Sequence, residues 1–487
     1  MRPPDAPPVR DLAVVGGGPA GMAAAVEASR AGLSVVLIDA AARLGGQYFR
    51  HAPPGFHARR PGALHHGFTR FTRLAEALGG AEEVELRLGH RVWAVEKVAA
   101  HVGDGTPVGA GDAGTPARTA EDGVVAVHCL AGARDERRET VLARRLLIAT
   151  GAHDRPLPFP GWDLPGVFTA GGAQALLKGD LVVAGRRVVV AGTGPFLLPV
   201  AAGLAAAGAD VAGVFEANGL FGAGLAMITH PGKLAQGAGY GLRLARHRVP
   251  LAGRHAVIAA HGRDELTHVT VARLDRHWVP GPSRVIECDA LAVGYGFVPQ
   301  IELATQLGCA THADRDGSPV VTVDAGMRTS VPGVYAAGEP TGVGGADPAE
   351  AEGRIAGLAV AADLGRPVAP VHRLRRKRAR LAAFGGALQD AYPVREGWKG
   401  WLRDDTLICR CEEVPYARIK EARALGAVDA RSLKLLARPG MGWCQGRMCG
   451  YAVACLAGEA QQAPRRPIAQ PVRLGDLAGH PEGEDPR

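Results

Sequence analysis

Four cysteines near the C-terminus are the residues of this sequence with the clearest potential for chemistry. They form two close pairs, Cys409 with Cys411 and Cys444 with Cys449, joined by a long spacer. A Cys-x-Cys pair does not readily place both sulfurs on one tetrahedral zinc ion, because zinc-binding pairs are usually spaced more widely. Two irons bridged by sulfide, each bound by two thiolates, fit the spacing better. The pairs therefore predict a [2Fe–2S] cluster, with zinc or plain structural thiols as the alternatives.

The spacer is expected to fold back and bring the two pairs together. One short helix is predicted to open at Pro415 and end at Gly426, and a second to span 430–438 before Gly440 stops it. Cys449 begins a third apolar helical stretch, where the positive end of the helix dipole favours a thiolate.

The remaining cysteines are expected to be ordinary core residues. No signal peptide is recognised before the first apolar strand, so disulfides are not expected. Cys129, Cys288 and Cys309 stand singly in apolar strands or loops, as buried free thiols do. Cys455 falls off the helical face of Cys449, and core packing is its expected role.

The N-terminus carries a complete strand–helix–strand motif for binding a dinucleotide. An apolar strand leads into Gly16-x-Gly18-x-x-Gly21, and a helix and a second apolar strand follow. Gly16 permits a tight turn, Gly18 lets the backbone approach a pyrophosphate, and Gly21 lets the helix pack closely on the strand. The pyrophosphate would rest on the helix N-terminus, and Asp39 would accept hydrogen bonds from ribose hydroxyls. The residues assigned to this first site are Gly16, Gly18, Pro19, Ala20, Gly21 and Asp39.

A second strand–helix–strand unit at 186–217 is less complete. Gly192 and Gly194 occupy the first two glycine positions, but Leu197 stands at the third. Its side chain would push the helix away from the strand or require compensating packing. Glu216 closes the second strand and favours an unphosphorylated ribose, hence NAD, ADP or ATP over NADP. The unit predicts either a second nucleotide site or a nucleotide fold retained as a scaffold.

Composition bounds the remaining possibilities. The chain has 487 residues, enough for about three domains, and its 47% hydrophobic and 21% charged residues are typical of a soluble globular protein. No apolar run is long enough to span a membrane. The expected location is the cytoplasm, either free or peripheral to the inner face of the membrane.

The charge and the histidines do not point to further chemistry. The net charge of +8 owes much to arginines at 372–380, but no nucleic-acid-binding motif accompanies them, so this run is interpreted as the solvated face of a connecting helix. The Gly-rich segment 103–115 is expected to be a hairpin tip. No Ser-His-Asp or metal-hydrolase pattern stands out, the 17 histidines share no spacing, and no catalytic acid or base is assigned.

The cysteine segment resembles a known type of iron–sulfur domain. CRCEEV followed by GMGWCQGRMCG is similar to the bacterioferritin-associated-ferredoxin type of [2Fe–2S] domain. The resemblance implies a small all-α domain. Its implied ligands are Cys409, Cys411, Cys444 and Cys449.

Three other segments resemble the two-dinucleotide-domain flavoprotein superfamily. They are RLGGQYF at 43–49, LLIATGAHDRPLPFPG at 146–161 and TSVPGVYAAGEPTG at 329–342. The resemblance implies FAD in the first site and a discontinuous FAD domain that contains the second nucleotide domain as an insertion. It adds to the FAD site the residues Gly46, Gln47, Val92, Thr150, Gly151, Gly338 and Glu339. Most relatives carry Asp at the position of Glu339, and the longer side chain should still reach a ribityl hydroxyl. Disulfide reductases of the superfamily carry a redox Cys pair beside the flavin, and this sequence has none there.

Nearly the whole chain resembles the FAD-and-[2Fe–2S] subunit of the opine oxidase, hydrogen cyanide synthase and (hydroxy)proline dehydrogenase group. The matching segments are GGGPAG at the start, VGYGFVPQIELATQLGC at 293–309, GGADPAEAEGRIAG at 344–357 and RRPIAQPVRLGDLA near the end. The resemblance implies a separate amine-oxidase-like flavoprotein subunit that oxidises a C–N bond. A small ferredoxin-like protein is a further candidate partner. The Pro-spaced tail is typical of an extended segment that docks on a surface.

The predicted fold is therefore α/β, with two Rossmann-like domains, one inserted in the other, and a small all-α [2Fe–2S] domain. The expected parts are an FAD domain at 1–158 and 286–371, a second nucleotide domain at 159–285, a basic connector at 372–404, the cluster domain at 405–462 and an extended tail at 463–487. The predicted function is electron transfer within a heteromeric amine or imino-acid dehydrogenase of opine, proline or glycine type. The alternatives are a self-contained NADH-dependent flavoprotein reductase and a non-enzymatic iron–sulfur sensor or scaffold.

Overall fold

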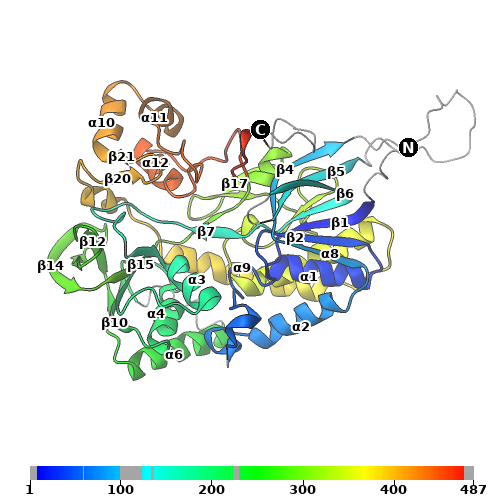
Figure 1. Ribbon diagram of the computed structural model, residues 1–487, viewed down its shortest axis with the longest axis horizontal. Helices are drawn as coiled ribbons and strands as arrows, with labels where there is room; N and C mark the ends of the chain where they lie inside the picture. Colours follow the sequence, from blue (N-terminus) through cyan, green and yellow to red (C-terminus); the bar gives the residue numbers. More distant parts are fainter. Residues whose placement is uncertain are drawn as a thin grey trace, which may run out of the picture.

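Two α/β units and a small cysteine-bearing module make up the chain in this computed structural model (Figure 1). The structure describes residues 8–58, 60–98, 123–132, 136–220, 222 and 230–475. The hairpin tip expected at 103–115 and the end of the tail lie outside these residues. Within the described ranges, no helix is long and apolar enough to cross a membrane.

The first unit is built on a mixed sheet whose parallel half has the strand order of a dinucleotide-binding fold. Its strands are β1 (Val9–Val15), β2 (Val35–Asp39), β3 (Val84–Leu88), β4 (His90–Val98), β5 (Val124–Ala131), β6 (Arg137–Ile148) and β19 (Val334–Ala336). Strands β3, β2, β1 and β6 run parallel in that order, and β19 pairs with the end of β6. Strands β5 and β4 extend the sheet as an antiparallel meander. The carboxyl ends of the parallel strands therefore meet at one edge, where such folds bind their ligands.

Close helix packing explains why the helices that cover this sheet are rich in alanine and glycine. The helices of the unit are α1 (Pro19–Arg30), α2 (Phe68–Gly79), α7 (Glu302–Gln306) and α8 (Ala346–Asp363). A Cβ atom on Gly353 would stand 2.0 Å from the Ala20 carbonyl oxygen, and one on Gly357 would stand 2.5 Å from that of Ala24. Only glycine at these positions lets α8 lie directly on α1. Both glycines belong to the segment GGADPAEAEGRIAG at 344–357, so the packing of α8 on α1 gives that part of the sequence a structural role.

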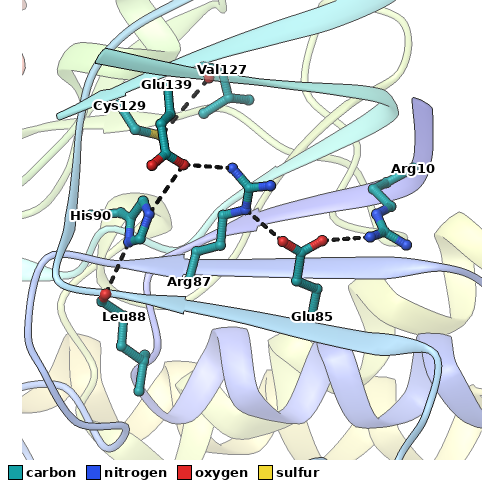
Figure 2. Close-up of polar contacts among 8 residues, drawn as sticks. All are labelled: Arg10, Glu85, Arg87, Leu88, His90, Val127, Cys129 and Glu139. Atoms are coloured by element: carbon teal, nitrogen blue, oxygen red, sulfur yellow. Dashed lines mark hydrogen bonds and ion pairs between the residues drawn. The ribbon is translucent and has the colours of Figure 1, made fainter. Parts of the chain in front are cut away.

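A ladder of ion pairs joins the parallel half of the sheet to the meander (Figure 2). Glu85 accepts from Arg10 at 2.5 Å and from Arg87 at 2.7 Å. Arg87 also bonds Glu139 at 2.9 Å, and His90 lies 3.4 Å from the same carboxylate. Because the four carboxylate and guanidinium groups link β1, β3 and β6, the ladder fixes strand register, although each partly exposed pair stabilises the fold only modestly.

The second unit repeats the architecture of the first. Its strands are β8 (Val167–Thr169), β9 (Arg187–Gly192), β10 (Asp210–Glu216), β11 (Leu251–Gly253), β12 (His255–His261), β13 (His268–Leu274), β14 (Pro280–Glu287) and β15 (Ala290–Gly294), and its helices are α3 (Ala170–Asp180), α4 (Leu197–Ala206) and α6 (Pro231–Arg246). A parallel sheet has the order β11-β10-β9-β15-β8, and β12, β13 and β14 form an antiparallel meander. Strand β15 belongs to this sheet although it lies beyond 285, so the boundary expected there is wrong. The chain crosses between the units through β7 (Ala152–Asp154) and β16 (Phe297–Pro299), which pair with each other.

The cysteine-bearing module, residues 405–462, contains the three short helices that the sequence predicts. They are α10 (Tyr416–Ala424), α11 (Ala430–Ala437) and α12 (Gly450–Ala457). The module is not entirely helical, because β20 (Leu407–Cys409) and β21 (Val414–Pro415) form a short antiparallel ladder. It lies against the second unit (Figure 1), where Trp162 donates to the Leu407 carbonyl at 2.6 Å. The end of the connector packs there as well, with Trp401 stacked on Trp278. The module therefore shares a hydrophobic core with that unit.

The basic run at 372–380 lies in helix α9 (His372–Ala391), as expected for a connecting helix. Its face is not wholly solvated. Arg378 donates to buried Glu352 of α8 at 2.8 Å, and Leu374 packs against the core of the first unit. One arginine of the run thus anchors the connector.

Ion pairs also join the two units across their interface. Asp347 in α8 accepts from Arg70 in α2 and from Lys233 in α6, each at 2.6 Å. Burial alone would raise the pKa of Asp347, but the hydrogen bonds from Lys233 and Arg70 outweigh it and lower the pKa to about 2. The carboxylate is therefore ionised in the folded protein at any pH above that range.

Replacing Asp347 with asparagine should destabilise the protein at neutral pH but not in acid. A carboxyl whose pKa falls on folding contributes stability above its unfolded pKa and loses it as the pH falls through the folded value. A lowering from 3.8 to about 2 corresponds to up to about 2 kcal/mol in the free energy of unfolding. Thermal unfolding should show a lower Tm for the variant at pH 7, with the difference shrinking from about pH 4 towards pH 2.

The matched control is Asp210→Asn, which removes the exposed pair with Arg187 on one edge of the second unit. Its effect should be small, because exposed pairs contribute little. Equal effects of the two variants, or a difference independent of pH, would contradict the account of Asp347.

Candidate functional site

The turn between β1 and α1 has the geometry that its glycines predict. Gly16 has φ +112°, and a Cβ there would stand 2.2 Å from the Ala149 carbonyl oxygen. A Cβ on Gly21 would stand 1.8 Å from the carbonyl oxygen of Gly16. Gly18 differs, because its φ of −79° suits any residue and its nearest neighbour is the Cα of Gly46 at 3.9 Å. Gly16 and Gly21 are thus required by the fold, whereas Gly18 keeps a surface open beside the helix N-terminus.

Asp39 stands at the end of β2 and faces this turn. Its carboxylate accepts from the Gly17 amide and, at 2.7 Å, from the Ala41 amide. Burial raises the pKa of Asp39, while these amides and the charge of Arg50 act in the opposite direction. The side chain is thereby held at the position where the sequence predicts a ribose contact.

A cavity of about 2160 Å³ collects most of the predicted nucleotide-site residues on its wall. From the first site it is lined by Gly16, Gly18, Pro19, Ala20, Asp39, Gly46, Gln47, Val92, Thr150, Gly151, Gly338 and Glu339, and from the second by Gly194 and Glu216. Gly21 and Gly192 do not line it, because they pack against backbone. Its volume exceeds the roughly 300 to 1,000 Å³ of ordinary ligand pockets, so it can hold more than one ligand.

Two acidic residues, Glu339 and Glu352, lie close enough to interact electrostatically near the turn after β19. Glu339 accepts from the Gly345 amide at 2.8 Å, and burial, aided by the charge of Glu352, raises its pKa to about 7. Glu352 is buried and accepts from the Gly338 amide at 2.8 Å and the Thr341 hydroxyl at 2.9 Å. Glu352 is not among the site residues that the sequence predicts, although an acidic residue within the apolar helix α8 is a signal that could have shown it.

The second motif is built differently from the first. Gly192 has φ +140° and packs against Gly294, where a Cβ would stand 1.8 Å from a carbonyl oxygen. Helix α1 begins directly after Gly18, but α4 begins at Leu197, later than the equivalent position after Gly194. Leu197 is buried in the core of the unit. This burial is the compensating packing that the sequence predicts for a side chain at the third glycine position.

The carboxylate of Glu216 is already engaged within the protein. One oxygen accepts from the Thr193 hydroxyl at 2.8 Å, and the other accepts from the Gly194 amide at 2.8 Å. Burial raises the pKa of Glu216 to about 7, although the hydrogen bonds from these donors act to lower it. Asn218 beside it donates to the Pro393 carbonyl at 3.0 Å, so the end of the connector covers this part of the motif.

The module brings the four predicted thiols together in two adjacent pairs. The Sγ atoms of Cys411 and Cys444 are 3.4 Å apart. Cys409 and Cys449 form the second pair, and the hydrogen bond with the Cys449 thiol lowers the pKa of Cys409 to about 5. A Cβ on Gly442 would stand 2.8 Å from that of Cys411, so glycine is needed for the close approach. Among the described residues, no set of three or more His, Cys, Asp or Glu side chains is arranged so that it could hold a metal ion.

The other cysteines follow their expectation. Cys129, Cys288 and Cys309 are buried free thiols, and Cys455 is half-buried against the core of the module.

The loop that carries Cys444 and Cys449 contacts the cavity wall through Arg447. The Arg447 carbonyl accepts from His153 Nε2 at 3.1 Å, and its guanidinium pairs with Glu302 at 3.1 Å. His153 and Glu302 both line the cavity. Burial lowers the pKa of His153 to about 4, so the ring is neutral and Nε2 donates. The sequence analysis missed these contacts, because they join segments far apart in the chain.

The tail lies on its own chain and not on a separate surface, in the part that the structure describes. Arg447 donates to the carbonyl groups of Ile468 and Ala469, and Arg473 pairs with Glu136. Ala469 is buried, and it lines the cavity together with Gln470. Residues 463–475 thus form a strip laid on the surface of their own chain, and docking on a partner stays a prediction.

Comparisons with known proteins agree with this arrangement. The family model for the pyridine nucleotide-disulphide oxidoreductases matches residues 10–362. Hydrogen cyanide synthase subunit HcnB of Pseudomonas protegens is 35% identical, over 90% of this chain and 90% of its own length. An opine oxidase subunit of Agrobacterium tumefaciens is 33% identical, over 97% of this chain and 92% of its own length.

Among solved structures, L-proline dehydrogenase from P. horikoshii has a similar fold. Its TM-score is 0.65 at 21% sequence identity, and the match covers 96% of this chain and 79% of that chain. The resemblance to hydrogen cyanide synthase and opine oxidase subunits is thereby confirmed. The resemblance of the cysteine module to a ferredoxin-type domain stays a prediction.

Proposed function

This chain belongs to the pyridine nucleotide-disulphide oxidoreductase family and is an oxidoreductase, and from that premise we propose that it carries FAD and a [2Fe–2S] cluster as one subunit of a heteromeric amine or imino-acid dehydrogenase. One observation carries the proposal. Through Arg447, the loop that holds Cys444 and Cys449 bonds to His153 and Glu302, which line the cavity that the flavin-type motif opens into. The two candidate redox sites are therefore neighbours within one chain.

The residues of the first motif fit a bound FAD. Gly18 and Gly46 face each other closely enough that a Cβ on Gly46 would stand 2.8 Å from the Gly18 Cα, which leaves a bare backbone cradle for a pyrophosphate. The N-terminus of α1 and the carboxylate of Asp39 border the cradle. Glu339 and Gln47 also line the cavity. When bound, FAD supplies a carrier of electron pairs and a [2Fe–2S] cluster supplies a carrier of single electrons.

The thiols of the module fit a [2Fe–2S] cluster better than the alternatives. Cys409 and Cys449 are buried, whereas Cys411 is exposed, so the set is open to solvent on one side as an electron-transfer centre needs. The Gly440 amide points at Cys409 Sγ from 3.5 Å, and such hydrogen bonds tune a thiolate-bound centre. A purely structural role would not require glycines that clear space around the sulfurs.

The relatives support a heteromeric assembly. The hydrogen cyanide synthase and opine oxidase relatives are subunits by name, and the chain covers almost their full length. By analogy, a second, amine-oxidase-like flavoprotein subunit would oxidise the C–N bond, and a small ferredoxin-like protein is a further candidate partner. This chain would then transfer the electrons from that subunit to an acceptor.

A self-contained NADH-dependent reductase is the second candidate, because Gly194 lines the same cavity as Gly18. The later start of α4 and the internal bonds of Glu216 weigh against it. A nucleotide could use this carboxylate only after the Thr193 and Gly194 donors release it.

Assays of the full chain with and without its co-purifying partner test the function. With the partner, an artificial acceptor should be reduced in the presence of an opine, proline or glycine. The isolated chain should neither oxidise these amines nor turn over NADH rapidly. Rapid NADH oxidation by the isolated chain, with no amine-dependent turnover in the complex, would contradict the proposal and support the reductase.

A further inference from the structure

Lys178 is a buried cation on the cavity wall with no counter-ion among the described residues. It lies on α3 and is only 8% exposed. Its ammonium group lies 3.4 Å from the Tyr48 carbonyl oxygen and 5.8 Å from the Tyr48 ring centre. Burial is the one cause that lowers the pKa of Lys178 to about 8. Burying a charged group without an opposite charge costs free energy, and a bound anion would reduce that cost at Lys178.

Two other cations that line the same cavity have counter-ions. Lys233 pairs with Asp347 at 2.6 Å, and buried Arg155 pairs with Asp316 at 2.6 Å. Lys178 differs from these two, because it has no such partner among the described residues.

Arg50 lies beside Lys178 and has an unused donor of its own. Its side chain crosses the backbone of α3, with Cδ 3.2 Å from the position of a Cβ on Gly179. One guanidinium nitrogen donates to Gln47 at 2.8 Å, but the buried Nε has no partner in the described part of the protein. Two cationic side chains thus present donors to the same part of the cavity.

Lys178 lies on α3 and therefore in the other unit from the cradle at Gly18 and Gly46. Arg50 lies between the two places, because its charge also acts on Asp39 beside the cradle. The N-terminus of α1 already provides donors for a pyrophosphate, so the cations at α3 are not needed for it.

We propose that Lys178 and Arg50 form an anion-binding site that takes a carboxylate or phosphate group of a ligand other than the dinucleotide of the first motif. Such a group would accept charge-assisted hydrogen bonds from both side chains. The cavity has room for a second ligand, since its volume is about 2160 Å³. The proposal does not depend on the identity of the redox partner or of the second nucleotide.

Competitive labelling of the full chain, purified with its own cofactors, tests the site. Trace acetylation near pH 8 followed by peptide mass spectrometry measures the reactivity of each lysine. Sodium phosphate and sodium acetate are the two probes, compared with sodium chloride at equal ionic strength. A bound anion keeps Lys178 protonated and shielded, so its labelling should fall by about tenfold at saturation, while exposed Lys377 should not change.

Protection by phosphate alone would assign a phosphate-bearing ligand, and protection by acetate alone a carboxylate. Lys178→Met should abolish the calorimetric binding of the effective probe, Lys178→Arg should retain part of it, and Lys377→Met should retain all of it. The labelling of the unmodified protein decides the matter even where Lys178→Met does not fold. A Lys178 that neither probe protects, or that is unreactive in every condition, would overturn the proposal.

Discussion

Replacing Gly18 with valine is expected to give a folded protein that has lost its flavin. The φ of −79° at Gly18 suits a valine, and the nearest atom to its Cβ position is 3.9 Å away, so the fold should tolerate the change. The new side chain would nevertheless fill the cradle opposite Gly46, where a pyrophosphate must approach the backbone. The flavin-to-protein ratio, measured from the visible spectrum, should fall below about a tenth of that of the unmodified protein.

Gly194→Ala provides the matched control in the second motif. A Cβ at Gly194 meets nothing within 4 Å, but its φ of +102° makes any side chain strained by about 1 to 3 kcal/mol. The control should therefore melt at a lower temperature and keep its FAD. A variant of Gly18 that retains flavin, or a folded variant of Gly194 that loses it, would mean that the two sites are assigned the wrong way round.

Replacing Cys444 with serine is expected to remove the iron centre and spare the flavin. Cys444 lies 3.4 Å from Cys411, and a serine hydroxyl is a far weaker ligand for iron than a thiolate. Iron and acid-labile sulfide should fall below about a tenth of their original content. FAD should stay bound, because the cradle at Gly18 lies in a different unit.

Cys455→Ser is the control for this variant, because Cys455 lies in the same module and is only half-buried. It should keep full iron and sulfide content. Zinc in place of iron in the unmodified protein, or an unchanged iron content in Cys444→Ser, would contradict the assignment of the thiols.

Local features were the ones that the sequence could predict. The β1–α1 turn depends on residues adjacent in the chain, so Gly16 and Gly21 could be assigned their structural roles directly. The three short helices of the module were predictable for the same reason, since proline, glycine and the apolar pattern set their ends. Leu197 likewise indicated a need for compensating packing, which its burial in the core of the second unit provides.

Contacts between segments far apart in the chain could not be predicted from the sequence. The bond of His153 to Arg447 joins residues 294 positions apart, and no local pattern encodes it. The proline spacing of the tail predicts an extended conformation but does not identify the surface on which the tail lies. Strand β15 was assigned to the wrong unit because a buried apolar strand carries no mark of the sheet it joins.

The central claim is that one chain holds a flavin and a [2Fe–2S] cluster close enough to exchange electrons. Anaerobic photoreduction of the purified full chain, followed by electron paramagnetic resonance at low temperature, tests it most directly. The account predicts that bleaching of the flavin is accompanied by the signal of a reduced [2Fe–2S] cluster, and that the signal is absent from Cys444→Ser. Complete reduction of the flavin with no iron–sulfur signal from the unmodified protein would contradict it.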